Sequence, residues 1–499
     1  MPALPKSLPK VCVALGFESI EELSHAAETE YRDGNSLLEV RLDNLQRPHD
    51  GIEWIRRFRR SRADAKVLAT CRHQEHHGRF RGSVEQQIRL LCDASGAGAF
   101  AVDLEVESAE GARTAVAALR ERTAVIVSYH NFESTPSLSG VMKRLMRVPA
   151  EAYKIATLAR KPSDTMRVIE FLKEQRKLPL VTFAMSEQGF GTRVLSPAYG
   201  ALFSYASPAG APGTAPGQVP ARVMKTLYHV DKLSRTSKVY GVIGDPVAHS
   251  KSPQIHNRAF QARRIDAVYL PYRVGPSQLG DWMRLAQNLP ICGFSVTIPH
   301  KQKIIRFLDH VEPLAKRIGA VNTVWRRAGK WRGTNTDVDG VMKPLSAYGR
   351  LAHTPVLLAG YGGAARAAAF ALREAGANLT ITGRDLRRAS ALAKAVTART
   401  VPLPAAVKER YHVLIHATPV GMHPNHEECL FPDVVPADVV FDMVYNPQET
   451  TLIARAKEQG REVIYGTEMF LEQAAAQFET WTGETAPRSV MRQALEHDV

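Results

Sequence analysis

Apolar segments with the length of β-strands recur through the first half of the chain, and amphipathic stretches separate most of them. Residues 20–32 and 163–175 are two of these stretches and are predicted helices. Strands that alternate with helices are typical of parallel βα units, and eight such units in about 225 residues fit a (β/α)8 TIM barrel. The predicted strands are residues 10–16, 36–43, 66–72, 99–107, 124–130, 152–159, 178–186 and 201–207.

Two of these predicted strands carry charged residues at every second position. In residues 36–43, Glu39, Arg41 and Asp43 fall on one face and apolar residues fall on the other. Residues 99–107 repeat the alternation with acidic residues. Charges that point into a barrel are costly unless they are paired or functional. The pattern therefore has two interpretations, a paired structural network or a binding site.

Candidate catalytic groups lie on three later strands, near the ends at which barrel active sites form. Lys154 lies inside an apolar strand, so we expect desolvation to lower its pKa and leave a neutral amine that can form an imine with a ketone. His130 can move a proton on the adjacent carbon, and Arg193 can hold a substrate carboxylate. Taken singly, His130 is more typical of a core histidine, and Lys154 can also extend to the barrel rim.

These segments together resemble type I 3-dehydroquinate dehydratase, a barrel enzyme that acts through a Schiff base. The resemblance covers about residues 8–230 and rests on Glu39-x-Arg41, Ser128-x-His130, Tyr-Lys154 and an APGQ sequence that ends at Gln218. It implies that Lys154 forms the imine and that His130 acts as acid and base. It also implies that the substrate is bound by Glu39, Arg41, Arg72, Arg193 and Gln218.

The chain departs from that family's pattern in two loops. Four residues after the position of Arg72 the family has an acid followed by two glycines, and here either Glu75 or His76 can replace that acid. Thr214 stands where the family has a serine, and it keeps the hydroxyl. Residues 207–217 have the composition of a flexible linker, but the resemblance places them in the eighth barrel loop. Residues 219–230 then form the last barrel helix.

The second half of the chain carries a separate set of candidate groups. Ser252, followed by a proline, is a predicted helix N-cap, and hydroxyls at a helix N-terminus can also bind an anion. Lys301 and Asp337, if folding brings them together, can deliver a proton to a developing alkoxide. As lone residues they would more typically be surface charges.

A glycine-rich turn then lies between predicted elements in the order of a dinucleotide-binding unit. Strand 355–359 is followed by the sequence GYGGAA, a helix at 364–375 and a strand at 378–382. Glycines in such a turn let backbone amides approach a pyrophosphate at the helix N-terminus. Arg384 and Arg388 follow the second strand and suit the 2′-phosphate of NADP, although Asp385 is an unfavourable neighbour for that phosphate.

Residues 238–495 resemble shikimate dehydrogenase in many ordered motifs, including HSxSPxxHN, VTxPxK and ATPVGM. The resemblance implies that Ser250 and Ser252 hold the substrate carboxylate and that Lys301 and Asp337 are catalytic. Retention of both serines favours shikimate over quinate. The remaining implied substrate residues are Thr297, Asn322, Tyr445 and Gln473. The implied cofactor residues are Gly360, Gly362, Gly363, Ala364, Arg384, Arg388, Thr418, Met443 and Gly466. The chain departs from the family at Ser295, at His416 and at residues 383–385.

The predicted organisation is a TIM barrel followed by a two-domain shikimate-dehydrogenase-like α/β unit. Residues 8–232 form the dehydratase barrel, residues 238–345 the substrate-binding domain and residues 346–469 a Rossmann NADP-binding domain. Helices at about 470–499 complete the substrate-binding domain. We expect a bifunctional enzyme that dehydrates 3-dehydroquinate and then reduces 3-dehydroshikimate to shikimate with NADPH. The alternatives are a quinate dehydrogenase that uses NAD in catabolism and a ligand-sensing regulator without turnover.

Composition bounds the partners and the location. The chain is 44% hydrophobic, which argues against large-scale disorder, and its net charge of +15 favours anionic partners. Substrate carboxylates and a dinucleotide account for part of that charge, and no nucleic-acid motif stands out. Residues 1–10 lack the apolar core of a secretory signal, no segment suits a membrane span, and the five cysteines are widely separated. We therefore expect a cytoplasmic protein without a metal site, although His73, His76 and His77 lie close in sequence.

Overall fold

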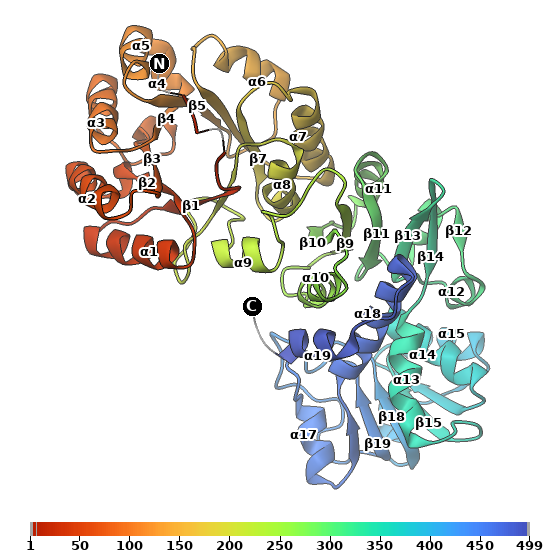
Figure 1. The fold of residues 1–499 in the computed structure, drawn as a ribbon. Coiled ribbons are helices and arrows are strands. Elements are labelled where there is room, and N and C mark those ends of the chain that lie inside the picture. The colour runs from red at the N-terminus through yellow and green to blue at the C-terminus, as the bar shows by residue number, and fades with distance from the viewer. Residues whose placement is uncertain (1–2, 6, 497–499) are drawn as a thin grey trace. The chain divides into compact units, whose positions relative to one another are not determined.

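The computed structural model describes residues 3–5 and 7–496. Part of the signal-sequence prediction on residues 1–10, and the last three residues of the predicted C-terminal helices, lie outside the described residues. The chain divides into two compact units. The first contains the chain up to Val239 together with Asp266–Pro290, and the second contains Tyr240–Ile265 together with the chain from Ile291 (Figure 1).

Eight parallel strands form the sheet of the first unit, in the order β7-β6-β5-β4-β3-β2-β1-β8 (Figure 1). The amide of Leu202, just before β8, donates to the carbonyl of Leu180 at 2.7 Å and links the two ends of the sheet. The predicted TIM barrel is therefore confirmed. The strands are β1 Val11–Leu15, β2 Leu37–Arg41, β3 Lys66–Thr70, β4 Ala101–Glu105, β5 Ala124–His130, β6 Ala152–Leu158, β7 Leu180–Met185 and β8 Ser204–Ala206.

Helices follow the strands and cover the outside of the barrel (Figure 1). Inside, small side chains such as Cys12, Ala101 and Ala124 pack with the larger rings of Phe203 and Tyr205 into an apolar layer. The helices are α1 Ile20–Arg32, α2 Pro48–Ser61, α3 Val84–Gly96, α4 Val106–Gly111, α5 Arg113–Arg120, α6 Leu138–Leu145, α7 Pro162–Glu174, α8 Phe190–Leu195 and α9 Ala221–Thr226.

A second sheet has the strand order β10-β9-β11-β13-β14-β12, with β13 antiparallel to both β11 and β14. Its strands are β9 Lys238–Gly244, β10 Ala267–Arg273, β11 Ile291–Val296, β12 His310–Val311, β13 Thr323–Arg327 and β14 Lys330–Thr334. The helices of this region are α10 Ser252–Ala262, α11 Leu279–Asn288, α12 Pro313–Ile318 and α13 Asp337–Leu345.

The third sheet is parallel, in the order β17-β16-β15-β18-β19-β20. This is the doubly wound order expected of a Rossmann domain, so that prediction is confirmed. The strands are β15 Pro355–Ala359, β16 Asn378–Thr382, β17 Arg399–Thr400, β18 Tyr411–His416, β19 Ala437–Asp442 and β20 Glu462–Ile464. The helices are α14 Gly363–Glu374, α15 Leu386–Ala395, α16 Leu403–Ala406, α17 Thr451–Glu458, α18 Gly466–Thr482 and α19 Arg488–Glu496.

Most element bounds agree with the sequence pattern to within a few residues, but several strands end earlier than predicted. The predicted strand at 99–107 is Ala101–Glu105, because α4 begins at Val106 and includes Glu107. The predicted strand at 36–43 ends at Arg41, because a 3₁₀ turn, Leu42–Asn44, follows it. The predicted helix at 219–230 is only Ala221–Thr226. The prediction of Ser252 as an N-cap is wrong: the helix already includes Ser252, and its N-cap residue is Lys251. The bounds of the three sequence-derived domains stay a prediction.

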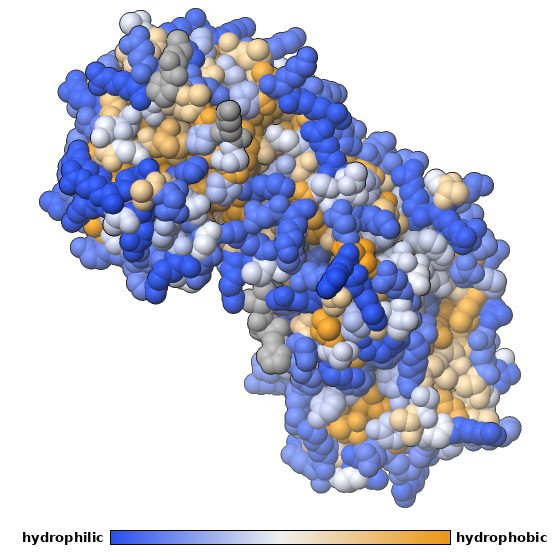
Figure 2. Space-filling view, viewed as in Figure 1, coloured by the Kyte–Doolittle hydropathy of each residue, from blue (hydrophilic) through white to orange (hydrophobic). Residues whose placement is uncertain are grey.

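Polar residues cover most of the face drawn in Figure 2. None of the helices that the structure describes is long and apolar enough to cross a bilayer. Among the same residues, no group of three His, Cys, Asp or Glu side chains is placed to hold a metal ion.

Candidate active sites

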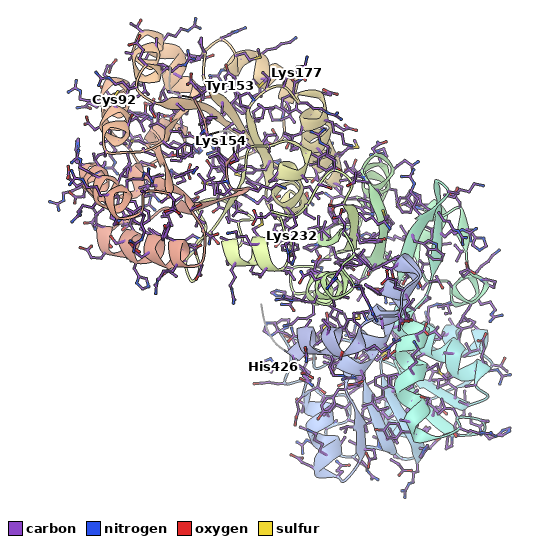
Figure 3. All side chains as sticks on the ribbon, in the orientation of Figure 1. Cys92, Tyr153, Lys154, Lys177, Lys232 and His426 are labelled. Atoms are coloured by element: carbon purple, nitrogen blue, oxygen red, sulfur yellow. The ribbon has the colours of Figure 1, made fainter. Side chains whose placement is uncertain are left out.

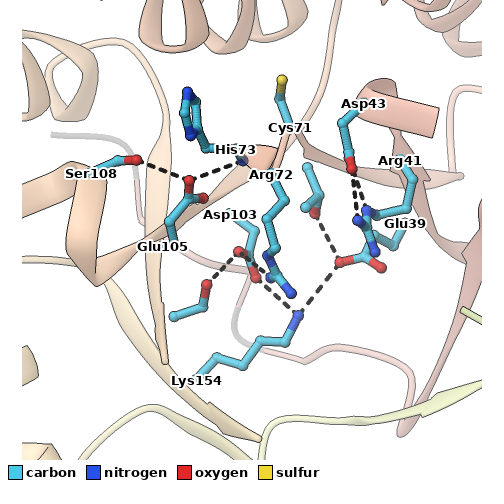
Figure 4. A network of polar contacts seen from close by, with 12 residues as sticks. Glu39, Arg41, Asp43, Cys71, Arg72, His73, Asp103, Glu105, Ser108 and Lys154 are labelled. Atoms are coloured by element: carbon cyan, nitrogen blue, oxygen red, sulfur yellow. Dashed lines mark hydrogen bonds and ion pairs between the residues drawn. The ribbon is translucent and has the colours of Figure 1, made fainter. Parts of the chain in front are cut away.

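Lys154 lies in the interior of the barrel, in a network of charged residues from neighbouring strands (Figures 3 and 4). Its Nζ atom donates to Oδ2 of Asp103 at 3.0 Å and to the hydroxyl of Tyr205 at 2.9 Å. Oε1 of Glu39 lies 3.6 Å from the same nitrogen. The strand alternation placed Glu39 and Asp103 on the inner face, and the structure confirms this direction for both. The sequence argument considered only desolvation of Lys154, whereas two carboxylates stand beside it.

Asp103 is the centre of this network. Its Oδ1 atom accepts from the hydroxyl of Ser128 at 2.6 Å and lies 3.5 Å from Nη2 of Arg72. Desolvation alone would raise the pKa of Asp103, but the charges of Lys154 and Arg72 and the hydrogen bonds lower it below its usual value. Asp103 is therefore a fixed anion. The sequence pattern indicates only that this residue belongs to the acidic face of residues 99–107, and it predicts no role for it in the site.

A second ion pair stands at the end of β2. Nε and Nη2 of Arg41 donate to the two carboxylate oxygens of Asp43 at 2.9 and 2.7 Å. Asp43 also accepts from the amide of Arg79 at 3.1 Å. The carboxylate therefore fixes Arg41 in a forked geometry and ties the loop after β3 to the loop after β2.

His130 lies at the end of β5 and faces the same cavity. Its pKa is lowered well below the usual value, first by burial and then by the charges of Arg72, Lys154 and Arg41. The imidazole is therefore neutral at neutral pH, which is the state that a general base requires.

Arg193 is fully buried on α8, at 0% exposure, with its guanidinium 4.5 Å from the ring centre of Phe183. Nη2 donates to the carbonyl of Pro216 at 2.8 Å, while Nε and Nη1 have no partner among the described residues. Burial lowers its pKa to about 9, so the side chain stays charged at neutral pH. Two buried donors without acceptors suit a substrate carboxylate.

The loop after β3 reaches the cavity through residues other than those expected. Glu75 and His76 lie in a short 3₁₀ turn and do not line the cavity, whereas His77 and Arg79 do. His77 has a positive φ of 64° and its ring lies 4.7 Å from that of Phe132. Neither suggested substitute for the family's acid therefore reaches the site.

The eighth barrel loop, which follows β8, contributes residues to the cavity. Thr214 and Gln218 both line the cavity, and the amide of Thr214 donates to Oε1 of Gln218 at 2.7 Å. Gly217 has a φ of +76°, and a Cβ there would lie 2.7 Å from the carbonyl of Ser186. Residues 212–215 therefore line the cavity, and the implied binding of a ligand by this loop stays a prediction.

These groups surround one cavity of about 320 Å³. The predicted residues Glu39, Arg41, Arg72, His130, Lys154, Thr214 and Gln218 line it, whereas Arg193 does not. Tyr205 also lines the cavity, and the sequence did not predict it, because a tyrosine fits the pattern of an apolar strand as well as a residue without a hydroxyl does.

In the second unit, Lys301 and Asp337 form the predicted pair. Nζ of Lys301 donates to Oδ2 of Asp337 at 2.5 Å, and Nδ2 of Asn322 donates to Oδ1 of the same carboxylate at 2.7 Å. Lys301 is 18% exposed and Asp337 is 4% exposed. The amide of Asp337 donates to Oδ1 of Asn335 at 3.1 Å, which fixes the carboxylate at the start of α13.

The other predicted substrate residues belong to the same unit. Ser250 precedes α10, and its hydroxyl accepts from the amide of Ser252 at 3.3 Å. Thr297 follows β11, Tyr445 stacks on Phe470 at 4.5 Å between ring centres, and Gln473 lies on α18. Ser295, where the family has asparagine, donates to Oε1 of Gln477 at 2.8 Å.

The glycine-rich turn after β15 excludes a side chain at Gly360, whereas a Cβ on Gly362 would meet no described atom within 4 Å. Gly360 has a φ of +129°, and a Cβ there would lie 2.6 Å from the carbonyl of Ala417. A Cβ on Gly363 would lie 3.1 Å from Cδ of Lys301, so the start of α14 lies against Lys301. Gly362 is the N-cap of this helix, and Ala364 follows in its first turn.

Asp385 has a structural partner. Its Oδ1 atom accepts from the amides of Arg387 and Arg388 at 3.0 and 3.2 Å and caps α15. The guanidinium of Arg388 lies 4.8 Å from the ring centre of Tyr361 in the glycine-rich turn, and Arg384 is exposed beside it. Cap formation thus directs the carboxylate toward its own helix.

The remaining cofactor residues cluster where β18 and β19 end. Buried His416 contacts Asp442 through Nδ1 at 2.9 Å and Thr418 through Nε2 at 2.6 Å. The amide of Met443 donates to the carbonyl of His416 at 2.9 Å. Gly466 starts α18, and a Cβ there would lie 2.2 Å from the carbonyl of Val444.

Family models match both halves of the chain. Residues 11–235 match type I 3-dehydroquinase, residues 242–324 match the shikimate dehydrogenase substrate binding domain, and residues 466–496 match the shikimate 5′-dehydrogenase C-terminal domain. The chain is also 32% identical to the bifunctional 3-dehydroquinate dehydratase/shikimate dehydrogenase, chloroplastic, of Arabidopsis thaliana, over 97% of this chain and 84% of that protein.

The chain belongs to the bifunctional 3-dehydroquinate dehydratase/shikimate dehydrogenase family. It is a lyase in its first half and an oxidoreductase in its second. Two comparisons concern the second half alone. The shikimate dehydrogenase (NADP(+)) of Nitrosopumilus maritimus is 38% identical over 52% of this chain and 98% of that protein. A structure of shikimate 5-dehydrogenase from Listeria monocytogenes, in complex with shikimate and NAD, is 30% identical over 53% of this chain and 98% of that chain, with a TM-score of 0.50.

Proposed function

We propose that the barrel dehydrates 3-dehydroquinate through an imine at Lys154. The observation that carries this proposal is the position of Lys154, whose amine lines a cavity in which carboxylates and neutral His130 surround it. The neutral imidazole removes a proton from the carbon next to the imine, and the same proton then leaves with the departing hydroxyl as water.

The substrate is held by groups of both charges. Arg193 does not line the cavity in this structure, but two of its guanidinium nitrogens have no partner among the described residues and would bind the carboxylate; Thr214 and Gln218 line the cavity from the eighth loop. Glu39, Arg41 and Arg72 meet its hydroxyls. A carboxylate bound to Arg193 also satisfies donors that would otherwise remain buried without a partner.

The test is the Lys154→Ala variant, with Lys177→Ala as the matched control at an exposed position (Figure 3). Borohydride added with 3-dehydroquinate should add mass at Lys154 in the parent and in the control, and none in Lys154→Ala. Dehydration should fall by about a thousandfold or more in Lys154→Ala, while shikimate oxidation by the same chain should be unchanged. Dehydration at the parent rate in Lys154→Ala would disprove the proposal.

In the second unit, we propose that Lys301 and Asp337 move the proton when 3-dehydroshikimate is reduced. NADPH, when bound, supplies the hydride. Lys301 lies against Gly363 at the start of α14, so its ammonium stands where the cofactor helix meets the substrate side. Asp337 holds that ammonium, and Asn322 holds Asp337. Ser250 and Ser252 bind the carboxylate, and Thr297, Tyr445 and Gln473 complete the pocket.

NADP is the cofactor that the site supports. The glycine-rich turn has no room for a side chain at Gly360 and leads into the N-terminus of α14, whose backbone amides suit a pyrophosphate. Arg384 and Arg388 would then contact a 2′-phosphate, because the carboxylate of Asp385 is engaged by its own helix. Thr418, Met443 and Gly466 line the nicotinamide side.

The Arg388→Ala variant tests this preference, with the exposed Arg387→Ala on the same helix as its control. We expect KM for NADPH to rise about tenfold or more in Arg388→Ala, since a charge-assisted hydrogen bond contributes about 1.5–3 kcal/mol. KM for NADH should stay unchanged in both variants.

A second experiment compares shikimate with quinate to test which alcohol is the substrate. If quinate with NAD is turned over faster than shikimate with NADP, the protein is a quinate dehydrogenase instead.

We also propose the three domains at 8–232, 238–345 with the C-terminal helices, and 346–469, and a cytoplasmic location without nucleic-acid or membrane partners. The five free cysteines support a reducing compartment.

A further inference from the structure

Tyr205 lines the cavity of the barrel, and the proposed function gives it no role. It lies on β8, opposite Cys12 on β1, and is 2% exposed. Its ring packs edge-on against Phe183 and Phe203, with ring centres 5.8 and 5.5 Å away. Two aromatic contacts fix the ring, so the hydroxyl has a defined position.

That hydroxyl connects the lysine to a carboxylate. It accepts a hydrogen bond from Nζ of Lys154 at 2.9 Å and donates one to Oε1 of Glu39 at 3.1 Å. Thr70 donates to the same Oε1 atom at 2.8 Å and holds the carboxylate in place. Amine, hydroxyl and carboxylate therefore form a continuous chain within the distances at which protons transfer.

Imine formation requires such a path. The nitrogen of Lys154 lies 3.0 Å from Asp103 and 3.6 Å from Glu39, which is ion-pair geometry, and an ammonium group in such a pair must pass on a proton before it can attack a ketone. Asp103 is a poor acceptor because Arg72, Ser128 and Lys154 already stabilise its anion. Burial, followed by the charge of Glu39, raises the pKa of Tyr205 well above its usual value, so the hydroxyl keeps its own proton at rest.

We propose that Tyr205 relays a proton from Lys154 to Glu39 and returns it when the imine forms. The inference rests on the imine at Lys154. The ammonium proton moves to the Tyr205 oxygen as the hydroxyl proton moves to Glu39, which leaves a neutral amine and a neutral carboxyl group. The amine forms the C–N bond, and the carbinolamine oxygen takes a proton from nitrogen. The stored proton then returns through Tyr205 to that hydroxyl, which leaves as water. The ammonium and the ketone thus become a protonated imine and one water molecule.

The charged and titratable groups around the amine come from five other strands and the loop that follows β3. They are Cys12 on β1, Glu39 and Arg41 on β2, Arg72 after β3, Asp103 on β4, His130 on β5 and Tyr205 on β8, with Lys154 itself on β6.

Tyr205→Phe tests the relay because it removes one oxygen and keeps the ring. The control is Tyr153→Phe: Tyr153 is adjacent to Lys154 in sequence, and its hydroxyl donates to the carbonyl of Val148 at 3.2 Å (Figure 3). The rate of imine formation is followed by rapid mixing with 3-dehydroquinate and quenching with borohydride at several pH values. In Tyr205→Phe we expect a loss of about ten- to a hundredfold at neutral pH, recovered as pH rises and the amine loses its proton to solvent. Tyr153→Phe should match the parent.

Two further measurements separate the relay from a structural role. In mixtures of H₂O and D₂O the imine step of the parent should depend on two moving protons, and that of Tyr205→Phe on one. Shikimate oxidation by the same chain reports whether the protein is intact. If Tyr205→Phe forms the imine at the parent rate at every pH while Lys154→Ala forms none, the relay is wrong and the proposed dehydratase function stands. If borohydride traps no imine at Lys154 in the parent, both the relay and the proposed dehydratase mechanism are wrong.

Discussion

The two proposed active sites differ in the number of charged side chains that they bury. In the reaction proposed for the barrel, Lys154 is itself the covalent catalyst, and buried Asp103 and Glu39 lie beside it. In the reaction proposed for the second unit, NADPH supplies the reacting electrons, and one ion pair, Lys301 with Asp337, moves a proton. A site whose catalyst is one of its own side chains must hold charged groups in the interior, where they also affect the stability of the fold. A site that uses a bound cofactor depends more on glycines and hydroxyl groups that bind the cofactor and substrate.

Neutralising one carboxylate in each site should give the largest contrast. Asp103→Asn leaves Lys154 and Arg72 in the barrel interior with one counter-charge fewer, and removing one partner of a buried pair costs about 3–5 kcal/mol. Asp337→Asn should cost about 1 kcal/mol, because Lys301 is 18% exposed and water can reach it. Each variant should also lose about a hundredfold or more of its own activity.

The urea concentration at which each of the two activities is lost reports the two units separately in one chain. We expect the midpoint of the dehydratase to fall clearly in Asp103→Asn, with the dehydrogenase midpoint unchanged. Equal losses of stability in the two variants would show that burial does not distinguish the sites.

Acid should reveal a buried histidine in the second unit. Burial lowers the pKa of His256 to about 3 from an unfolded value of 6.5, with a hydrogen bond to Gln477 acting in the opposite direction. Above pH 6.5 the imidazole is neutral in both states. As pH falls from 6.5 toward 3 only the unfolded chain takes up the proton, so stability is lost, by about 2 kcal/mol at pH 5.

His256→Gln tests this assignment, since the variant cannot take up that proton. The dehydrogenase midpoint in urea should fall less between pH 7 and pH 5 in the variant than in the parent. The same fall in both proteins would assign the acid sensitivity to other groups.

Substitutions at the rim of the barrel should have smaller effects than substitutions in its interior. His77 lines the cavity from the loop after β3, with its ring beside Phe132, whereas neighbouring His76 does not line it. Asparagine accepts the positive φ of 64° at this position. His77→Asn should raise the KM of the dehydratase about tenfold through lost contact with the substrate, as expected for one charge-assisted hydrogen bond. His76→Asn should change nothing, and equal effects in both variants would place the substrate elsewhere.

The sequence predicted the barrel because its strands repeat at a regular spacing and the inward charges alternate with apolar residues. Such a pattern reports the face of a residue but not its neighbour across the barrel, so the roles of Asp103 and Tyr205 appeared only in the structure. The resemblance located His130 and Lys154 directly. It failed at the loop after β3, where hydrogen bonds between distant residues decide which side chain enters the cavity, such as the bond from the amide of His73 to Glu105.

In the second unit the resemblance performed better than local reasoning. Lys301 and Asp337 lie 36 positions apart, and no periodicity links them. The prediction of Ser252 as N-cap was wrong because the helix already includes Ser252, and Pro253 is tolerated at its second position, where no amide hydrogen is needed. The place of Asp385 was likewise hidden, since sequence shows a carboxylate near a phosphate site but not the two amides that bind it.

The smallest expected effect separates the charge of Asp385 from its cap. Asp385→Ala removes the acceptor for the amides of Arg387 and Arg388 and should cost about 1 kcal/mol, the usual contribution of an N-cap. Asp385→Asn keeps an acceptor and should retain that stability. Both variants lose an anion beside the two arginines, so the Kd for NADPH, measured by calorimetry, should fall by about twofold in each, which corresponds to a few tenths of a kcal/mol for an exposed charge. A weaker affinity for NADPH in Asp385→Asn would show that the carboxylate takes part in binding the cofactor, and the second site would then share with the barrel a dependence on a fixed anion.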